Sequence, residues 1–189
     1  FLNTAPSLIF IALNTHRPLF RDVSLRKAVN YALDRRAIAR LGTPFDRLPD
    51  RPTDQYLPPG IPGFADVRIP PLTPNVAAAR RLSGRKQRKA VLYTCNVTPC
   101  DQQAQIIRAG LAGIGIDLEV KTFPFSAMFE RLSRDGEPFD LALIGWIADY
   151  PDPAQFLNLL LLSGIIPTLE DPEYERKLEA AARLSGPPR

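Results

Sequence analysis

Two carboxylates, Asp149 and Asp152, follow an apolar run and stand between prolines in "LALIGWIADYPDPAQFLN". A pair of acids can hydrolyse a glycosidic bond when one is protonated and their separation suits the reaction. The sequence does not set that separation, and Asp152 directly precedes the helix-like "PAQFLNLL", where Asp is a favoured N-cap. The pair is therefore compatible with a hydrolase, and helix capping is the alternative for Asp152.

Other catalytic groups are scarce. The chain has one histidine, His16 in "NTHRPLF", which is expected in a loop after the first strand. The motifs G-x-S-x-G, H-E-x-x-H and G-x-x-x-x-G-K do not occur. Because a nucleophile needs a positioned base, the residues alone support no particular reaction, and the carboxylate pair stays open as an alternative.

The two cysteines, Cys95 and Cys100, stand in "YTCNVTPCDQQ". A zinc site needs four ligands, and no further cysteine and only the distant His16 are available. The spacing of four residues also differs from the C-x-x-C redox motif. A short-loop disulfide and two free thiols remain, and no metal or cofactor is expected.

Composition argues for a globular protein without a dedicated nucleic-acid surface. The 189 residues are 45% hydrophobic and carry a formal charge of +4. Six of the ten residues from 80 to 89 are Lys or Arg, which could bind phosphates, but such a run at a helix end is typically solvated. No apolar run reaches the ~20 residues of a membrane span, and "FLNTAPSLIF" has no basic region or cleavage site of a signal peptide.

The first half of the chain predicts a strand, a helix and a long irregular segment. The run "SLIFIALN" (7–14) suits a buried strand. The stretch 21–40 has helical spacing, with Asp22 or Ser24 as N-cap and Gly42 beyond its end. Residues 44–74 contain nine prolines, too many for a helix or central strand. We expect the aromatic residues of this segment to hold it in place: Phe45, Tyr56 and Phe64.

The second half alternates strands and helices. A short helix should follow Pro74 and end at Gly84. Between 90 and 145 the pattern is strand, helix capped by Asp101, strand, helix, strand, which implies parallel pairing through right-handed crossovers in an α/β fold. The glycines of "GLAGIGI" end a helix and enter a strand, the reverse of a phosphate loop, so C-capping explains Gly113 and Gly115.

Three stretches carry a resemblance to the family 5 extracellular solute-binding proteins, the dipeptide, oligopeptide and nickel receptors of bacterial ABC importers. "IFIALNTHRPLFRDVSLRKAVNYALDRRAI" resembles the family's strand, Asn-Thr, Pro-Phe-x-Asp and Arg-x-Ala-x-x-Tyr-Ala-x-Asp-Arg helix, with Leu19 here between Pro18 and Phe20. "IIRAGLAGIGIDLEVKTFPFSAMFERL" and "FDLALIGWIADYPDPAQFL" are similar to its helix-strand-helix and Gly-Trp-x-x-Asp-Tyr-x-Asp-Pro segments. The order and spacing of the three stretches carry the resemblance over nearly the whole chain.

The resemblance implies a mixed sheet with βαβ units flanked by helices, in a type II periplasmic-binding-protein lobe. Residues 1–189 would form one lobe, the C-terminal one, of a longer two-lobe protein, and the helix-like end of the chain fits such a truncation. A receptor of this kind binds a peptide or other small molecule without reaction chemistry. In an extracytoplasmic protein, the resemblance also favours a disulfide between Cys95 and Cys100.

The same resemblance assigns ligand-binding residues. Asp149 matches the acid that, in peptide-binding members, pairs with the ligand's α-ammonium group. The backbone of Trp146, Ile147 and Ala148 would hydrogen-bond the ligand, and the Trp146 and Tyr150 side chains would add apolar walls, although Trp146 could equally pack inside the lobe. The implied partner is an ABC permease, and the implied location is the periplasm or cell surface, with a lipid anchor outside these residues and no nucleic acid bound.

Overall fold

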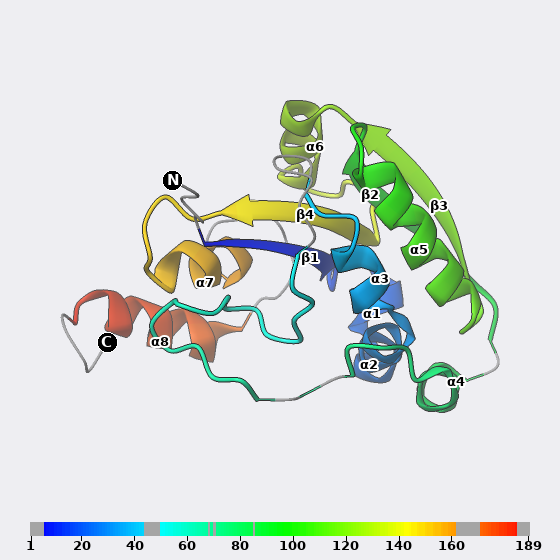
Figure 1. Ribbon diagram of the computed structural model, residues 1–189, viewed down its shortest axis with the longest axis horizontal. Helices are drawn as coiled ribbons and strands as arrows, with labels where there is room; N and C mark the ends of the chain where they lie inside the picture. Colours follow the sequence, from blue (N-terminus) through cyan, green and yellow to red (C-terminus); the bar gives the residue numbers. More distant parts are fainter. Residues whose placement is uncertain are drawn as a thin grey trace.

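A mixed four-stranded sheet forms the centre of the described structure. The computed structural model describes residues 6–43, 50–67, 69, 71–84, 86–161 and 171–184. Within them the strand order is β1-β4-β2-β3 (Figure 1). The parallel strands are β2 (Arg88–Cys95), β3 (Ile116–Phe123) and β4 (Leu141–Ile147), and β1 (Ser7–Leu13) runs antiparallel to β4. The predicted strands and their parallel pairing are confirmed.

Helices cover both faces of this sheet. One core joins one face to α2 (Val23–Ala32), α4 (Val76–Ser83) and α5 (Cys100–Ala112). The other face packs against α6 (Phe125–Leu132) and α7 (Ala154–Leu161) through residues such as Met128 and Leu159. The remaining helices are α1 (Pro18–Arg21), α3 (Arg35–Ala39) and α8 (Pro172–Ala182).

The helix expected over 21–40 is broken in two, so the prediction of one continuous helix is wrong. The α2 helix ends before Leu33, whose backbone is extended, and α3 starts after Asp34. The Asp34 carboxylate accepts a hydrogen bond from the Ala37 N–H. An Asp side chain that binds the backbone competes with helix continuation, which explains the break. Asp22, rather than Ser24, is the N-cap of α2.

A second correction concerns Asp101. The residue lies inside the first turn of α5, and Pro99 occupies the N-cap position without a side-chain hydrogen bond. Asp101 still carries negative charge at the positive end of the helix dipole. The predicted end of α4 at Gly84 is confirmed.

The proline-rich segment has no helix or strand in its described part, residues 50–67, 69 and 71–74. Tyr56 holds it against the sheet and α7, because its ring packs edge-on against Phe10 at 5.3 Å and Phe156 at 6.5 Å between ring centroids. Phe64 is half-buried, and Phe45 lies outside the described residues. The irregular segment and the anchoring role of Tyr56 are therefore as predicted.

A buried carboxylate joins three strands at one end of the sheet. Asp140, 3% exposed, accepts hydrogen bonds from Arg17 Nε at 2.7 Å and from the Val91 N–H at 2.9 Å. Its backbone carbonyl accepts the Asn14 N–H at 2.9 Å. Because this charge is paired and hydrogen-bonded, its burial is tolerated, and it ties the end of β1 to β2 and β4.

Gly115 makes the turn from α5 into β3, and its replacement should destabilise the protein. Its φ is +82°, and an added Cβ would lie 2.9 Å from the Lys86 carbonyl oxygen. Gly136 has a φ of +73° but open space around it. Gly136→Ala should therefore lower the free energy of unfolding only by the backbone strain, about 1–2 kcal/mol. Gly115→Ala should lower it further, because the added Cβ also meets the Lys86 carbonyl. Equal losses in chemical denaturation would contradict the close approach at Lys86.

The Glu137 carboxylate lies between two hydrogen-bond donors, one on β2 and one on α6. Its carboxylate accepts hydrogen bonds from the Tyr93 hydroxyl and from Arg131, both at 2.9 Å. Burial opposes ionisation of Glu137, but these two hydrogen bonds outweigh it and lower its pKa below the ordinary value of 4.5. Burial first, and then the bond to Glu137, raises the pKa of Tyr93 to about 12.

This network should make stability depend on acid pH. Because the pKa of Glu137 is lower in the folded state, its contribution is present above the unfolded-state pKa and is lost as pH falls through the folded one. The free energy of unfolding should therefore fall more steeply below about pH 4.3 for the wild type than for Glu137→Gln. Urea denaturation across this pH range measures both slopes, and parallel curves would rule out the contribution.

Candidate functional site

The carboxyl end of β4 presents a small mixed surface. Ile147 is 44% exposed and Tyr150 is 55% exposed, whereas Ala148 between them is buried. Asp149 is exposed, and its backbone N–H donates to Gln155 Oε1 at 3.3 Å. Within the described ranges no cationic side chain pairs with the Asp149 carboxylate. A carboxylate open to solvent thus stands between two exposed apolar side chains.

The backbone of this strand end is partly in use. The Ala148 N–H donates to the Pro6 carbonyl at 2.9 Å, so it is not available to a ligand in this conformation. In an antiparallel pair the hydrogen-bonded positions alternate. The backbone N–H and C=O of Trp146 therefore point toward Leu8 on β1, and those of Ile147 point away from β1. Ile147 lies past the last residues of β4 that pair with β2. Its backbone is therefore the part of the predicted trio that has no ladder partner among the described residues.

Trp146 packs partly into the apolar core. It is half-buried and contacts two apolar clusters, one around α6 and one around Phe156. Its indole Nε1 is buried and has no hydrogen-bond partner among the described residues. The ring thus acts chiefly as a support for the strand end, which is the alternative that the sequence left open.

Asp152 has a different role from Asp149. Its Oδ1 accepts the Ala154 N–H at 2.8 Å, and its carbonyl accepts the Gln155 N–H at 3.1 Å. These bonds satisfy free N–H groups at the start of α7, as an N-cap does. The carboxylate-pair hydrolase needed both acids directed at one shared cleft, and the capping role of Asp152 removes that arrangement.

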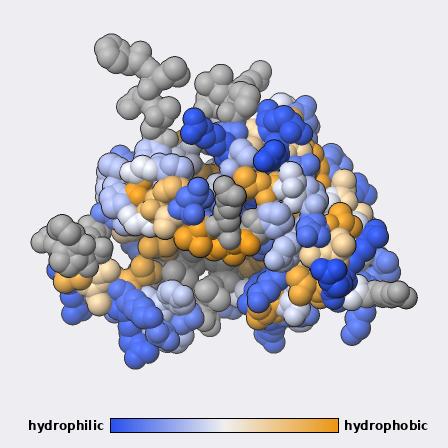
Figure 2. All heavy atoms as spheres, turned by 60° about the horizontal axis from the view of Figure 1, so that its bottom comes forward, coloured by the Kyte–Doolittle hydropathy of each residue, from blue (hydrophilic) through white to orange (hydrophobic). Residues whose placement is uncertain are grey.

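A cavity away from this strand end is a second candidate site, and the sequence did not predict it. It has a volume of about 1020 Å³ and is bounded by β1, α2, α3 and the proline-rich segment. None of the five predicted ligand-binding residues lines it. Figure 2 shows hydrophobic residues near the middle of the face that it turns toward the viewer. No motif marks this space, because its wall combines residues from β1, β4, α2, α3, α5 and the proline-rich segment.

Two polar side chains on the cavity wall, those of Arg35 and Tyr56, differ in their hydrogen bonding. Arg35 donates to the Asn30 side chain and carbonyl and to the Pro71 carbonyl. Burial lowers the pKa of Arg35, and the negative charge of Asp54 partly offsets this. Burial disfavours the charged form of Tyr56 too and therefore raises its pKa. The Tyr56 hydroxyl has no hydrogen-bond partner among the described residues. Arg35 thus holds the proline-rich segment to the end of α2.

The cysteines form a disulfide. Cys95 ends β2 and Cys100 begins α5, with 5.6 Å between their Cα atoms. This is the pairing that the resemblance implies. The described residues contain no group of three or more His, Cys, Asp or Glu side chains that could hold a metal ion.

Among the described residues, His16 and the basic run 80–89 form no binding pocket. His16 is exposed in the loop after β1, as predicted, and its backbone N–H donates to the Asn14 side chain. Arg80 donates to the Gly113 carbonyl, and Arg88 donates to the Ser83 and Lys86 carbonyls. These bonds hold the end of α5 to α4 and the start of β2 to the turn that follows α4. In the part of the chain described here, no helix has the length and apolar character needed to cross a bilayer.

Comparison with known proteins identifies the family. Residues 3–167 match the model of the bacterial extracellular solute-binding proteins, family 5 Middle. The chain belongs to this family. A match over most of the chain agrees with the mixed α/β fold described above, and family 5 proteins are periplasmic or extracellular.

Relatives of this family 5 chain are much longer. It is 31% identical over 156 residues to a probable di/tripeptide-binding protein of Pseudomonas aeruginosa, covering 79% of this chain and 28% of the relative. It is 29% identical over 174 residues to a heme-binding protein A of Haemophilus influenzae, and the match covers 85% of this chain and 30% of the relative. A dipeptide-binding protein from a Pseudoalteromonas species, solved with Met-Leu, shares the fold at 22% identity with a TM-score of 0.81, covering 98% of this chain and 38% of that one.

The capping role of Asp152 makes a prediction for this family 5 chain. Asp152→Ala should lower stability by about 0.5–2 kcal/mol, because it removes the N-cap of α7. Asp152→Asn should keep nearly all of it, since Asn caps as well as Asp. Denaturation of the two variants beside the wild type tests this. A loss as large for Asn as for Ala would show that the charge, and not the cap, is needed.

Proposed function

We propose that the chain is one lobe of a two-lobe receptor that binds a peptide and delivers it to an ABC-type permease. Family membership supports this proposal, and so do relatives named for di/tripeptide and oligopeptide binding. The chain spans about 30% of the length of such relatives, which is compatible with a second lobe supplied by the rest of the protein. The receptor performs no catalysis.

The exposed carboxylate of Asp149 is the observation that carries the proposal. It follows the carboxyl end of β4, where α/β sheets commonly bind ligands, and within the described residues no cation neutralises it. An α-ammonium group is a cation of suitable size for one carboxylate. When an opposing lobe closes and excludes water, the pair gains strength because the local dielectric falls.

The neighbouring groups fit a peptide backbone better than a particular side chain. Ile147 offers main-chain hydrogen-bonding groups on its open side, while Ile147 and Tyr150 offer exposed apolar surface. Main-chain bonds give affinity without strong sequence preference. The half-buried Trp146 and the buried Ala148 pack beneath this surface and support it.

The proposed setting is extracytoplasmic, at the periplasm or cell surface. The Cys95–Cys100 disulfide supports this location, since disulfides persist in oxidising compartments. A lipid anchor, if the receptor has one, would lie outside residues 1–189. The permease of the same transport system is the proposed protein partner, and no nucleic acid is involved.

Removing the Asp149 charge should abolish tight binding of a peptide with a free amino terminus. In the full-length protein, Asp149→Asn leaves an ammonium group unpaired in the closed cleft. Loss of one partner of a desolvated charge pair costs about 2–5 kcal/mol, so the Kd should rise by about 30-fold to several thousand-fold. Calorimetry with a free-amine dipeptide or tripeptide measures this change.

A matched ligand and a matched variant sharpen the test. An N-acetylated peptide should bind the wild type weakly, and Asp149→Asn should weaken it no further, because the pair is already absent. Asp152→Asn should leave the affinity for the free-amine peptide unchanged. Unaltered affinity in Asp149→Asn would refute the assigned role. Binding of heme but of neither peptide would identify another solute.

A further inference from the structure

The stretch between Asp66 and Asp101 carries positive charge only. It contains seven Lys or Arg residues and no Asp or Glu, whereas the whole chain has 24 basic and 20 acidic residues and a net charge of +4. The rest of the chain is therefore net negative. Five of the seven cations lie in the described parts of α4, the turn after it and the start of β2: Arg80, Arg81, Lys86, Arg88 and Lys89.

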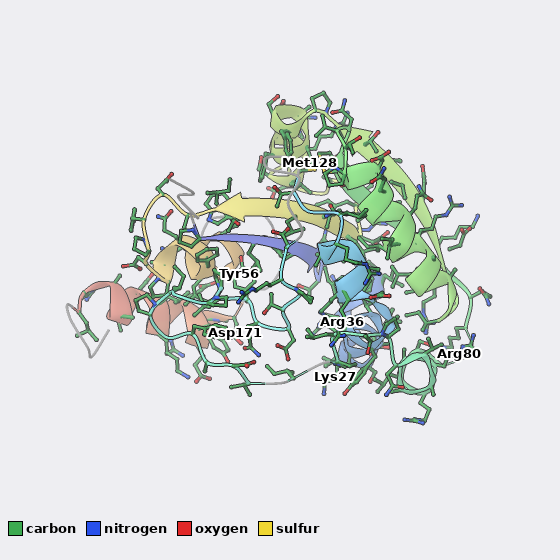
Figure 3. The ribbon with its side chains drawn as sticks, in the orientation of Figure 1. Lys27, Arg36, Tyr56, Arg80, Met128 and Asp171 are labelled. Carbon is green, nitrogen blue, oxygen red and sulfur yellow. A yellow bond between two sulfur atoms is a disulfide. The ribbon has the colours of Figure 1, made fainter. Side chains whose placement is uncertain are left out.

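Contacts with the backbone gather four of these cations at one end of the lobe. Arg80 Nε donates to the Gly113 carbonyl at the end of α5, and the Arg88 guanidinium donates to the Lys86 carbonyl. The Lys86 carbonyl in turn lies close to Gly115, just before β3. Figure 3 shows Arg80 beside α4 at the margin of the molecule. We call this group of side chains the basic end: Arg80, Arg81, Lys86 and Arg88.

Within the described ranges, no carboxylate forms an ion pair with the basic end. Asp117 lies opposite Lys89 in the β2–β3 ladder. Because successive side chains of a strand point to opposite faces, Asp117 and Lys89 lie on the face away from the Arg88 side chain. Three of the four cations of the basic end are exposed, and Arg88 is half-buried. The positive charge of this end is therefore open to a partner.

The outer face of α4 combines cations with apolar side chains. Val76 and Arg80 are four residues apart, and so are Ala77 and Arg81, so each pair lies on one side of the helix. All four residues are exposed, whereas Ala79 is buried on the inner side. Val76 alone is 40% exposed. Basic and apolar residues side by side on a helix surface are suited to the interface of a bilayer, where phosphates and acyl chains meet.

We propose that the basic end is a docking surface for a lipid bilayer that contains anionic headgroups. Each Lys or Arg held at such a surface strengthens binding by about fivefold. The proposal uses the extracytoplasmic setting proposed above, but it does not depend on which solute the receptor binds.

The position of the basic end relative to Asp149 gives this docking a consequence. Arg88 starts β2, and Asp149 follows the carboxyl end of β4, which runs parallel to β2. The two sites therefore lie at opposite ends of the parallel strands, and Figure 1 shows β4 pointing away from α4. A lobe docked in this way would stay at the membrane of its permease while the Asp149 surface faces away from the lipid.

Two other anionic partners fit less well. A small anion such as free phosphate needs donors that converge on a pocket, but the side chains of the basic end line neither the 1020 Å³ cavity nor the small one beside Cys100. Arg80 and Arg88 also use donors on backbone carbonyls. A nucleic acid would meet the same cations, but it gives no role to the exposed Val76. An extended surface of lipid headgroups meets neither obstacle.

Co-sedimentation of the full-length protein, free of any attached lipid, with vesicles tests the proposal. The protein should bind vesicles of phosphatidylglycerol and phosphatidylcholine in equal amounts and should not bind vesicles of phosphatidylcholine alone. Binding should weaken as the salt concentration rises, because exposed charges are screened. Absence of binding to both kinds of vesicle, or equal binding to both, would overturn the proposal.

Matched variants locate the surface. Arg81→Gln combined with Lys86→Gln should weaken binding to the anionic vesicles about 25-fold, since two cations are removed. Arg176→Gln combined with Arg183→Gln removes the same charge from α8 and should leave binding unchanged. Equal weakening by the two pairs would show that net charge, and not the basic end, is responsible, and would overturn the proposal. Thermal midpoints near that of the wild type confirm that the variants are folded.

Competitors separate the lipid surface from the other partners. Inorganic phosphate, matched to the vesicle phosphate concentration, should not displace the protein, and displacement would indicate a small-anion site and overturn the proposal. Tighter binding to duplex DNA than to the vesicles at the same salt concentration would indicate a nucleic-acid surface and overturn it as well. Arg81→Gln combined with Lys86→Gln should leave the peptide Kd unchanged in calorimetry, so this test and the test of Asp149 fail independently.

Discussion

The antiparallel pairing of β1 with β4 is the contact on which the rest of the structure depends. Its register runs from Ser7 opposite Ile147 to Leu13 opposite Leu141. Bonds at both ends hold it, from Ala148 to Pro6 and from Asn14 to Asp140, whose carboxylate also binds Arg17. A slip of one residue would turn every side chain of β1 to the wrong face. The same register determines where β4 ends.

Three residues separate two chemically identical groups with different roles. Asp149 follows the strand and keeps its carboxylate in solvent, whereas Asp152 directs an oxygen to the Ala154 N–H. The difference arises from the backbone, because the start of α7 places the Ala154 N–H within reach of the Asp152 carboxylate. A receptor can thus hold one negative charge ready for a ligand while the other completes a helix.

The sequence predicts most of the elements and misses what depends on several of them together. Alternation in β3 and the apolar run of β4 are strong local signals. The break at Asp34 is not, because the helical spacing continues across it, while Leu33 is extended and the Asp34 side chain caps α3 through the Ala37 N–H. The acid at Asp149 is predicted by motif, but the use of the Ala148 N–H by Pro6 depends on two residues 142 positions apart in the chain. The cavity likewise has no sequence pattern.

The alternation at the end of β4 separates two kinds of constraint on evolution. Trp146 and Ala148 face inward, and any change there disturbs packing on which folding depends. Ile147, Asp149 and Tyr150 face outward, and changes there alter the surface with little effect on the core. Such a strand end can acquire a new chemical preference by drift at the outward positions alone. Receptors with one shared fold can in this way diversify their solutes while the lobe beneath stays the same.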